Sequence, residues 1–218
     1  MILEKGDTVM NVPLILTQFL DRAVSLYGDK QAIICEDRVF TYHELNERVN
    51  RLSHGLKNLG VQKGDRIAYL APNSVEMLEG FYGIFQLGGV MVPLNSRLKP
   101  DDYQFILNHS ESKILFVDQD LYHLILPIKD KLKTIEKIIV HYKDSETEEL
   151  GYDVWLEEQS NEAFERFPLE EDNVSSLLYT SGTTGNPKGV MLTHRNNYIH
   201  ALSTMHHLRI TDEDVLLH

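Results

Sequence analysis

The sequence predicts an α/β fold, a doubly wound and mainly parallel sheet flanked by helices. Strand-like apolar runs alternate with helical patterns from the N-terminus onward, an order typical of repeated β-α-β units. Hydrophobic residues make up 42% of the 218 residues, enough to bury a sizeable core in one large domain or two small ones. A loop of glycine, serine and threonine at residues 180–185 stands between two apolar runs. We therefore expect it to join two strands at one edge of the sheet.

The clearest predicted helix covers residues 42–59. Its apolar residues recur at steps of four and three, which places them on one buried stripe. Thr41 and Glu44 have the spacing of a capping box, and Gly60 suits the position after the last turn. The stripe consists of Leu45, Val49, Leu52, Leu56 and Leu59. We assign this segment a structural role.

Two strands and a helix are expected next. A turn at residues 63–65 leads into a strand at 66–70. Asn73, with a glutamate three residues later, is predicted to cap a helix that runs to about Leu87. The next apolar run, at 90–94, predicts a further strand.

A second helix-and-strand series follows. Pro100 fits the first position of a helix, and the two aspartates after it suit the positive end of the helix dipole. Apolar runs at 113–117 and 137–140 predict two more strands. This order again indicates β-α-β organisation.

Acidic residues mark a connection at 144–172. Acids cluster there in DSETEE and in EED, so we expect a solvated segment with a short helix around Trp155. The predicted organisation is a first βαβ portion at 1–143, this connection, and a portion at 173–218 that carries the loop and a following helix. The run at 214–218 is strand-like.

The charge balance excludes one class of partner. Asp and Glu outnumber Lys and Arg by 33 to 21, for a formal net charge of -12. The resulting field repels phosphate backbones, so nucleic acid is not expected as a partner. A nucleotide remains compatible with this charge, because a few aimed donors hold a small anion without a basic surface. No apolar run approaches the roughly 18 to 20 residues of a membrane span.

Neither the cysteine nor the histidines indicate a reactive or metal site. Cys35 lies in an apolar run and is expected to be a buried strand thiol. A single cysteine and the lack of a signal pattern favour a cytoplasmic, reducing location. His206 and His207 are adjacent, so they point to different sides of a helix. His194 is expected in the first turn of a helix capped by Thr193, without catalytic duty.

The segment at 174–192, VSSLLYTSGTTGNPKGVML, carries the chemistry. Gly182 and Gly185 permit positive φ and close backbone approach, so successive N–H groups can point into one concavity and hold phosphate oxygens. The hydroxyls of the loop add donors and can ligate magnesium. Lys188 adds a mobile positive charge.

The spacing excludes two common phosphate-binding motifs. Pro187 stands five residues after Gly182, where the Walker A pattern requires glycine, and the Rossmann GxGxxG pattern is absent. The loop leads into residues 189–192, which are predicted to form a strand, not a helix whose N-terminus would hold pyrophosphate. The residues alone leave two alternatives open, an anion-binding hairpin and a flexible Gly/Thr loop.

The longer segment YTSGTTGNPKGVMLTHRN resembles the phosphate-binding signature of adenylate-forming (AMP-binding) enzymes: acyl-CoA ligases, luciferases and peptide-synthetase adenylation domains. FTYHEL at 40–45 and FQLGGVMVPLNSRL at 85–98 are also family-like. The segment PLNSRLKP resembles the acyl-CoA ligase branch of the family, in particular the long-chain fatty-acid ligases. This resemblance implies the N-terminal part of the acyl-CoA synthetase large domain.

The resemblance also implies an activity and a site. Such enzymes use ATP and Mg²⁺ to convert a carboxylic acid, here a fatty acid, to an acyl-adenylate and then to a coenzyme A thioester. Lys188 is implied to be catalytic by compensating charge on the departing pyrophosphate, and Thr180 is implied to contact magnesium. The implied phosphate-binding residues are Thr180, Ser181, Gly182, Thr183, Thr184, Gly185 and Lys188.

Three later motifs of the family have no counterpart before His218. These are an aromatic-Gly-x-Thr-Glu segment, a Thr-Gly-Asp segment and a C-terminal lysine. The resemblance therefore implies an N-terminal fragment that is inactive alone in the full reaction. Two alternatives stay open: a naturally short nucleotide-binding or regulatory module, and an adenylating enzyme that loads a carrier protein.

Overall fold

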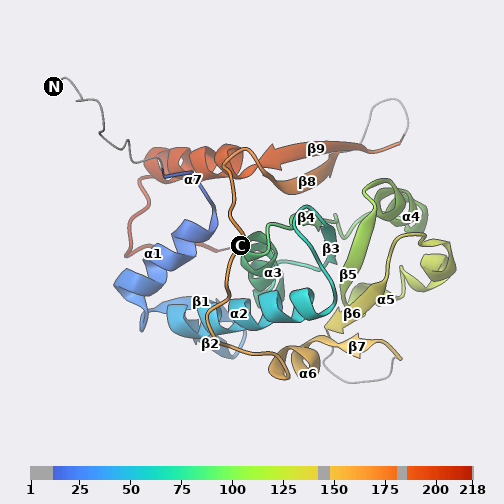
Figure 1. Ribbon diagram of the computed structural model, residues 1–218, viewed down its shortest axis with the longest axis horizontal. Helices are drawn as coiled ribbons and strands as arrows, with labels where there is room; N and C mark the ends of the chain where they lie inside the picture. The colour runs from blue at the N-terminus through green and yellow to red at the C-terminus, as the bar shows by residue number, and fades with distance from the viewer. Residues whose placement is uncertain (1–11, 142–147, 181–185, 218) are drawn as a thin grey trace.

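The computed structural model describes residues 12–141, 148–180 and 186–217 (Figure 1). Its centre is a seven-stranded sheet in the order β7-β6-β5-β3-β4-β8-β9, with helices on both faces. The neighbouring strands are parallel except for the β8–β9 pair. The predicted α/β class and mainly parallel sheet are confirmed.

A helix and a small hairpin precede this sheet. Helix α1 spans Thr17–Tyr27, and strands β1 (Gln31–Cys35) and β2 (Arg38–Thr41) form a separate two-stranded antiparallel sheet. Cys35 is partly exposed, so the expectation of a buried strand thiol is wrong. The reason is that β1 lies outside the main sheet and has one strand neighbour.

Helix α2 (Tyr42–Asn58) matches its prediction closely. Thr41 and Glu44 form both bonds of the capping box, and Gly60 follows the helix with φ 84°. A residue with a Cβ is strained at that angle, which explains the glycine. The side chains of Leu45, Val49, Leu52 and Leu56 are buried. The predicted stripe therefore packs into the core.

Strand β3 (Arg66–Leu70), helix α3 (Val75–Gln86) and strand β4 (Val90–Pro93) follow in the predicted order. The predicted cap is wrong by one residue. Ser74, not Asn73, caps α3, because its hydroxyl accepts a hydrogen bond from the Met77 N–H at 3.2 Å. Glu76 pairs instead with Arg38 at 2.7 Å.

The next elements of the chain include β5 and β6, the strands that lie between β3 and β7 in the main sheet. These elements are α4 (Pro100–His109), β5 (Ser112–Asp118), α5 (Gln119–Tyr122), the 3-10 helix η1 (Leu126–Lys131) and β6 (Lys137–His141). Successive residues of a strand point to opposite faces. Accordingly, Ile67 and Tyr69 join the core beneath α2 and α3, whereas Ala68 and Leu70 join the core beneath α4 and η1.

The acidic connection is more than a solvated link. Strand β7 (Leu150–Gly151) adds to the edge of the main sheet, and α6 (Tyr152–Glu157) is the short helix expected around Trp155. Trp155 and Leu156 are buried in the main core, so the expectation of a solvated segment is wrong for this part; residues 144–147 lie outside the described residues. The boundaries at 143 and 172 stay predictions, although strands from both flanking portions share one sheet.

A buried ion pair joins α2, α3 and α6. Glu79 of α3 is fully buried; it accepts hydrogen bonds from Arg48 Nε at 2.5 Å and from the Tyr152 hydroxyl at 2.7 Å. Burial raises the pKa of Glu79, while the Arg48 guanidinium opposes this shift. Removing either charge would leave the other poorly compensated.

Strands β8 (Val174–Thr180) and β9 (Lys188–Thr193) and helix α7 (His194–Leu208) form the C-terminal part. The expected strand at 214–218 is not observed, since residues 214–217 lie exposed without a pairing strand.

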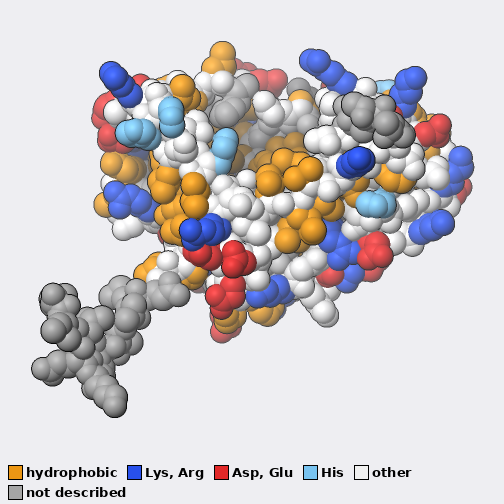
Figure 2. Space-filling model, turned by 90° about the horizontal axis from the view of Figure 1, so that it is seen from above, with side chains coloured by type: hydrophobic (Ala, Val, Ile, Leu, Met, Phe, Trp, Pro, Cys, Tyr) orange, Lys and Arg blue, Asp and Glu red, His pale blue; other side chains and the backbone are white. Residues whose placement is uncertain are grey.

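Hydrophobic side chains gather on the face that carries α7, β8 and β9 (Figure 2), and Met191 of β9 is 69% exposed. Across the described residues, no helix is long and apolar enough to cross a membrane.

Candidate functional site

The candidate site is the far end of the β8–β9 hairpin. The two strands pair antiparallel from Val174 and Thr193 to Thr180 and Lys188, and β9 is the edge strand of the sheet. The prediction that the Gly/Thr loop joins two strands at one sheet edge is therefore confirmed. The strand expected at 189–192 is β9.

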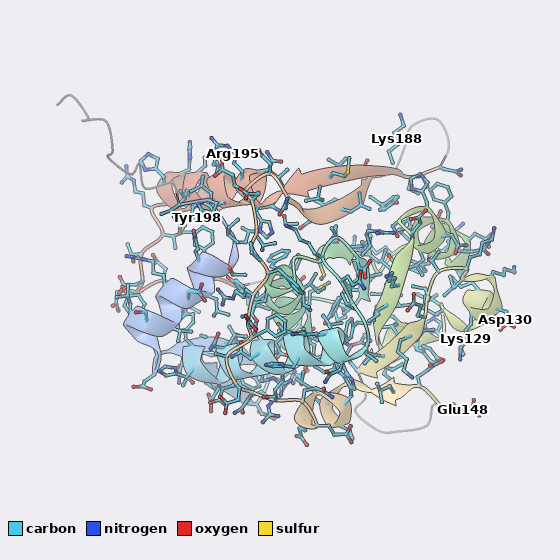
Figure 3. The ribbon with its side chains drawn as sticks, in the orientation of Figure 1. Lys129, Asp130, Glu148, Lys188, Arg195 and Tyr198 are labelled. Atoms are coloured by element: carbon cyan, nitrogen blue, oxygen red, sulfur yellow. The ribbon has the colours of Figure 1, made fainter. Side chains whose placement is uncertain are left out.

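Two of the predicted site residues are described by the structure. Thr180 and Lys188 are directly paired in the ladder, so their backbones lie side by side where the strands end. Both residues are exposed, and the Lys188 side chain projects away from the sheet (Figure 3). The other predicted phosphate-binding residues, Ser181, Gly182, Thr183, Thr184 and Gly185, lie outside the described residues. Their role stays a prediction.

Just before the end of the strands, an aromatic ring packs across the hairpin. Tyr179 is paired with Gly189. A Cβ on Gly189 would lie 3.0 Å from a methyl carbon of Leu177 and 3.3 Å from the Tyr179 ring, so the glycine leaves room for both side chains. The motif contains Tyr179 and Gly189, but the sequence reasoning gave neither a role, since the pairing register was not known.

The base of the hairpin continues directly into α7. Thr193 and Asn196 form a capping box, which confirms the predicted Thr193 cap and the place of His194 in the first turn. The His194 N–H donates to the Asn173 carbonyl at 3.0 Å, and the Arg195 N–H donates to the Glu171 carbonyl at 2.9 Å. These two bonds attach the start of α7, which follows β9, to the segment that leads into β8.

His194 is buried completely, which the sequence did not indicate. Its Nδ1 accepts a hydrogen bond from the Leu16 N–H at 3.4 Å, and its ring meets Phe85 edge-on at 5.5 Å. Burial, assisted by the positive charge of Lys63, lowers the pKa of His194 from 6.5 to about 4. Neutral His194 thus joins the N-terminal segment to the hairpin. The sequence pattern does not predict this contact, because Leu16 lies 178 residues before His194.

The N-terminal part of the chain is further joined to α7 by a bridge through Glu171 and by a stack of two aromatic rings. Glu171 accepts a hydrogen bond from the Leu14 N–H at 3.1 Å and forms an ion pair with Arg195 at 2.5 Å. The Leu14 bond, with help from Arg195, lowers the pKa of Glu171. Phe19 stacks on Tyr198 with ring centroids 4.4 Å apart, and Tyr198 lies on the α1 side of α7 (Figure 3). Contacts with the N-terminal part of the chain therefore hold the start of α7 beside the base of the hairpin.

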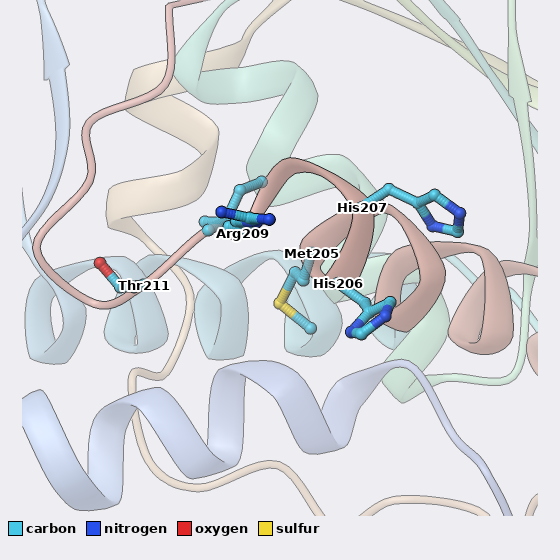
Figure 4. A pocket seen from close by; sticks show the side chains of 6 residues that line it. Met205, His206, His207, Arg209 and Thr211 are labelled. Atoms are coloured by element: carbon cyan, nitrogen blue, oxygen red, sulfur yellow. The ribbon is translucent and has the colours of Figure 1, made fainter.

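The described part of the chain also has hollows away from the end of the hairpin. One, of about 330 Å³, adjoins Leu177 and Met191 near the start of β8. Another, of about 650 Å³, lies at the end of α7 between Met205 and Thr211; its lining side chains diverge (Figure 4). Neither hollow includes Thr180 or Lys188. Within the described ranges, no group of three or more His, Cys, Asp or Glu residues is placed to hold a metal ion.

Comparison with known proteins gives a consistent result. The profile of the family described as AMP-binding enzyme matches residues 20–218. A long-chain-fatty-acid–CoA ligase from Thermus thermophilus is 36% identical over 217 residues, which is 97% of this chain and 39% of that protein. A 4-hydroxybutyrate–CoA ligase from Metallosphaera sedula is 35% identical over 193 residues, 85% of this chain and 35% of that protein.

A solved structure shares the fold. ATP-bound MatB from Rhodopseudomonas palustris superimposes with a TM-score of 0.80 at 28% identity, covering 95% of this chain and 40% of that one. The chain thus spans about two fifths of the length of the proteins that it resembles.

Proposed function

The chain belongs to the AMP-binding enzyme family, and from this premise we propose that it supplies the phosphate-binding hairpin of an ATP-dependent acid–CoA ligase. In the proposed reaction, a carboxylate oxygen attacks the α-phosphorus of ATP, and the bond to the pyrophosphate oxygen breaks. The acyl-adenylate then reacts with the thiol of coenzyme A, which forms the thioester and releases AMP. The 218 residues alone are proposed to be inactive in this full reaction.

The pairing of Thr180 with Lys188 carries the proposal. Two anions, a carboxylate and a triphosphate, must approach each other, so the protein has to align them and offset their repulsion. Lys188 is exposed, and its side chain projects from the end of β9. There it stabilises the negative charge that develops on the departing pyrophosphate. Residues 180–185 form the rest of the proposed cradle.

Magnesium is proposed to bind at the same end of the hairpin. Thr180 is an exposed residue with a hydroxyl group, and its backbone is paired with that of Lys188; hydroxyl and phosphate oxygens are ligands that Mg²⁺ accepts. When bound, the ion would neutralise phosphate charge. The fit rests on this donor type and on its position.

A fatty acid is the proposed substrate, because the residue pattern PLNSRLKP and the 36% identical relative both favour that branch. The relatives act on several acids, including 4-hydroxybutyrate, so a panel of acids is needed in the test. Coenzyme A is the proposed acceptor and the cytoplasm the proposed location. A carrier-protein thiol is the competing acceptor.

Acid-dependent exchange of labelled pyrophosphate into ATP tests adenylation without the acceptor step. The assay uses the longer chain that contains these 218 residues, with acetate, medium-chain and long-chain acids. We expect exchange with long-chain acids, and Lys188→Ala should lower its rate about 100-fold. Lys137→Ala, at an exposed position of β6 remote from the hairpin, is the matched control. Wild-type exchange by Lys188→Ala would exclude the role of this lysine.

A further inference from the structure

A side-chain contact joins helix α4 to the hairpin beside the proposed phosphate site. The hydroxyl of Tyr179 lies 2.7 Å from Nδ1 of His109, the last residue of α4. The two rings meet edge-on, with centroids 5.9 Å apart and planes at 84°. Tyr179 immediately precedes Thr180, so this contact acts one residue from the proposed cradle.

Both partners are held in place by neighbouring side chains. His109 stacks on Phe105, one helical turn earlier, with centroids 5.2 Å apart and planes at 21°. The ring of Tyr179 lies against Gly189 and packs at the rim of the core beneath α4. The rings of Phe105, His109 and Tyr179 therefore connect α4 to both strands of the hairpin.

The backbone gives this end of the hairpin little support. Within the described residues, β8 is in register with β4 at one pair, Met91 and Ser176. Tyr179 lies three residues beyond that pair, and β9 is the edge strand of the sheet. Past Ser176, side-chain contacts can help to set the direction of the hairpin, and the His109–Tyr179 bond is placed to do this.

We propose that His109 is a positioning residue for adenylation. Through Tyr179 it fixes the direction in which Thr180 and Lys188 meet the triphosphate. His109 itself touches no reacting atom in this account. The inference rests on the proposed function, because it assigns a purpose to the geometry of that same site.

The test separates the hydrogen bond from the ring stack. Tyr179→Phe keeps the ring and removes the hydroxyl. His109→Phe keeps a ring against Phe105 but removes the polar partner, whereas His109→Asn keeps a polar group near the position of Nδ1 and removes the stack. Tyr103→Phe is the matched control, because it deletes another tyrosine hydrogen bond of α4, to the Asn95 carbonyl at 2.9 Å.

The readouts are KM for MgATP and kcat in pyrophosphate exchange, together with the melting temperature, all measured in the longer chain. Loss of one hydrogen bond predicts an increase in KM of about 3- to 10-fold for Tyr179→Phe and for His109→Phe. The double variant should be no worse than either single variant, because both remove the same bond. His109→Asn should restore part of the loss, and all melting temperatures should match that of Tyr103→Phe.

Three outcomes would overturn the inference. They are wild-type KM in Tyr179→Phe, additive losses in the double variant, and losses that follow the melting temperature and appear equally in Tyr103→Phe. A failure of the proposed function is distinguishable, since the wild-type protein would then show no exchange with any acid.

Discussion

Acidification should weaken the attachment of the N-terminal segment to the hairpin through His194. In the folded chain this side chain is buried and neutral, and its Nδ1 accepts the Leu16 N–H. A proton on Nδ1 would abolish that acceptor and bury a charge. The folded-state pKa, about 4, lies below the ordinary 6.5, so the unfolded chain binds more protons between these values. The stability that neutral His194 contributes is therefore fully present above pH 6.5 and is lost as the pH falls towards 4.

The magnitude follows from the two pKa values. Between pH 7 and pH 4.5, protonation linked to His194 should lower the free energy of unfolding by about 2 kcal/mol. Burial also lowers the pKa of His141 to about 4, so a second histidine contributes with the same sign. Replacing His194 should remove its own contribution and keep that of His141.

Urea unfolding at several pH values measures this directly. His194→Gln should lose about 2 kcal/mol less than the wild-type chain over the same pH interval. His200→Gln is the matched control, because it removes a histidine from an exposed position of the same helix. An identical pH dependence in the wild-type chain and His194→Gln would contradict this role of His194. So would a stability that rises on acidification.

Three further substitutions test the fold by urea unfolding at pH 7. Glu79→Ala should cost about 2 to 4 kcal/mol, because it leaves the mostly buried Arg48 with only the exposed and more distant Asp153 among the described carboxylates; a loss below 1 kcal/mol would contradict this. Gly80→Ala should cost about 1 to 3 kcal/mol, since its Cβ would lie 2.5 Å from the Tyr69 ring, and a gain in stability would oppose that account. Thr193→Ala should cost about 1 kcal/mol by removing the cap of α7, and an unchanged free energy of unfolding would contradict this role of the cap.

Local sequence signals predicted the elements that depend on local physics. The 42–59 helix carries its own stripe, cap and stop glycine, and the structure reproduces all three. The hairpin of the site was predictable for the same reason, since two apolar runs flank a Gly/Thr segment. The cap of α3 was placed one residue early because Asn73 and Ser74 are both good caps.

Long-range features were not predictable from the pattern. The burial of His194 depends on Leu16 and Phe85, which are distant in the sequence and contact His194 only after the chain has folded. Trp155 enters the core although acids surround it in the sequence, because α6 packs beside α2. The His109–Tyr179 bond likewise joins residues 70 positions apart. A single sequence contains no record of such pairs.

The proposed role of the end of the β8–β9 hairpin is to bind the phosphates of ATP. Backbone amide NMR shifts of this chain, titrated with magnesium pyrophosphate and with MgATP, test it most directly and tolerate weak binding. We expect saturable shifts concentrated at residues 180–188, and their loss in Lys188→Ala. Shifts confined to other regions, or no shift with either ligand in a folded chain, would contradict it.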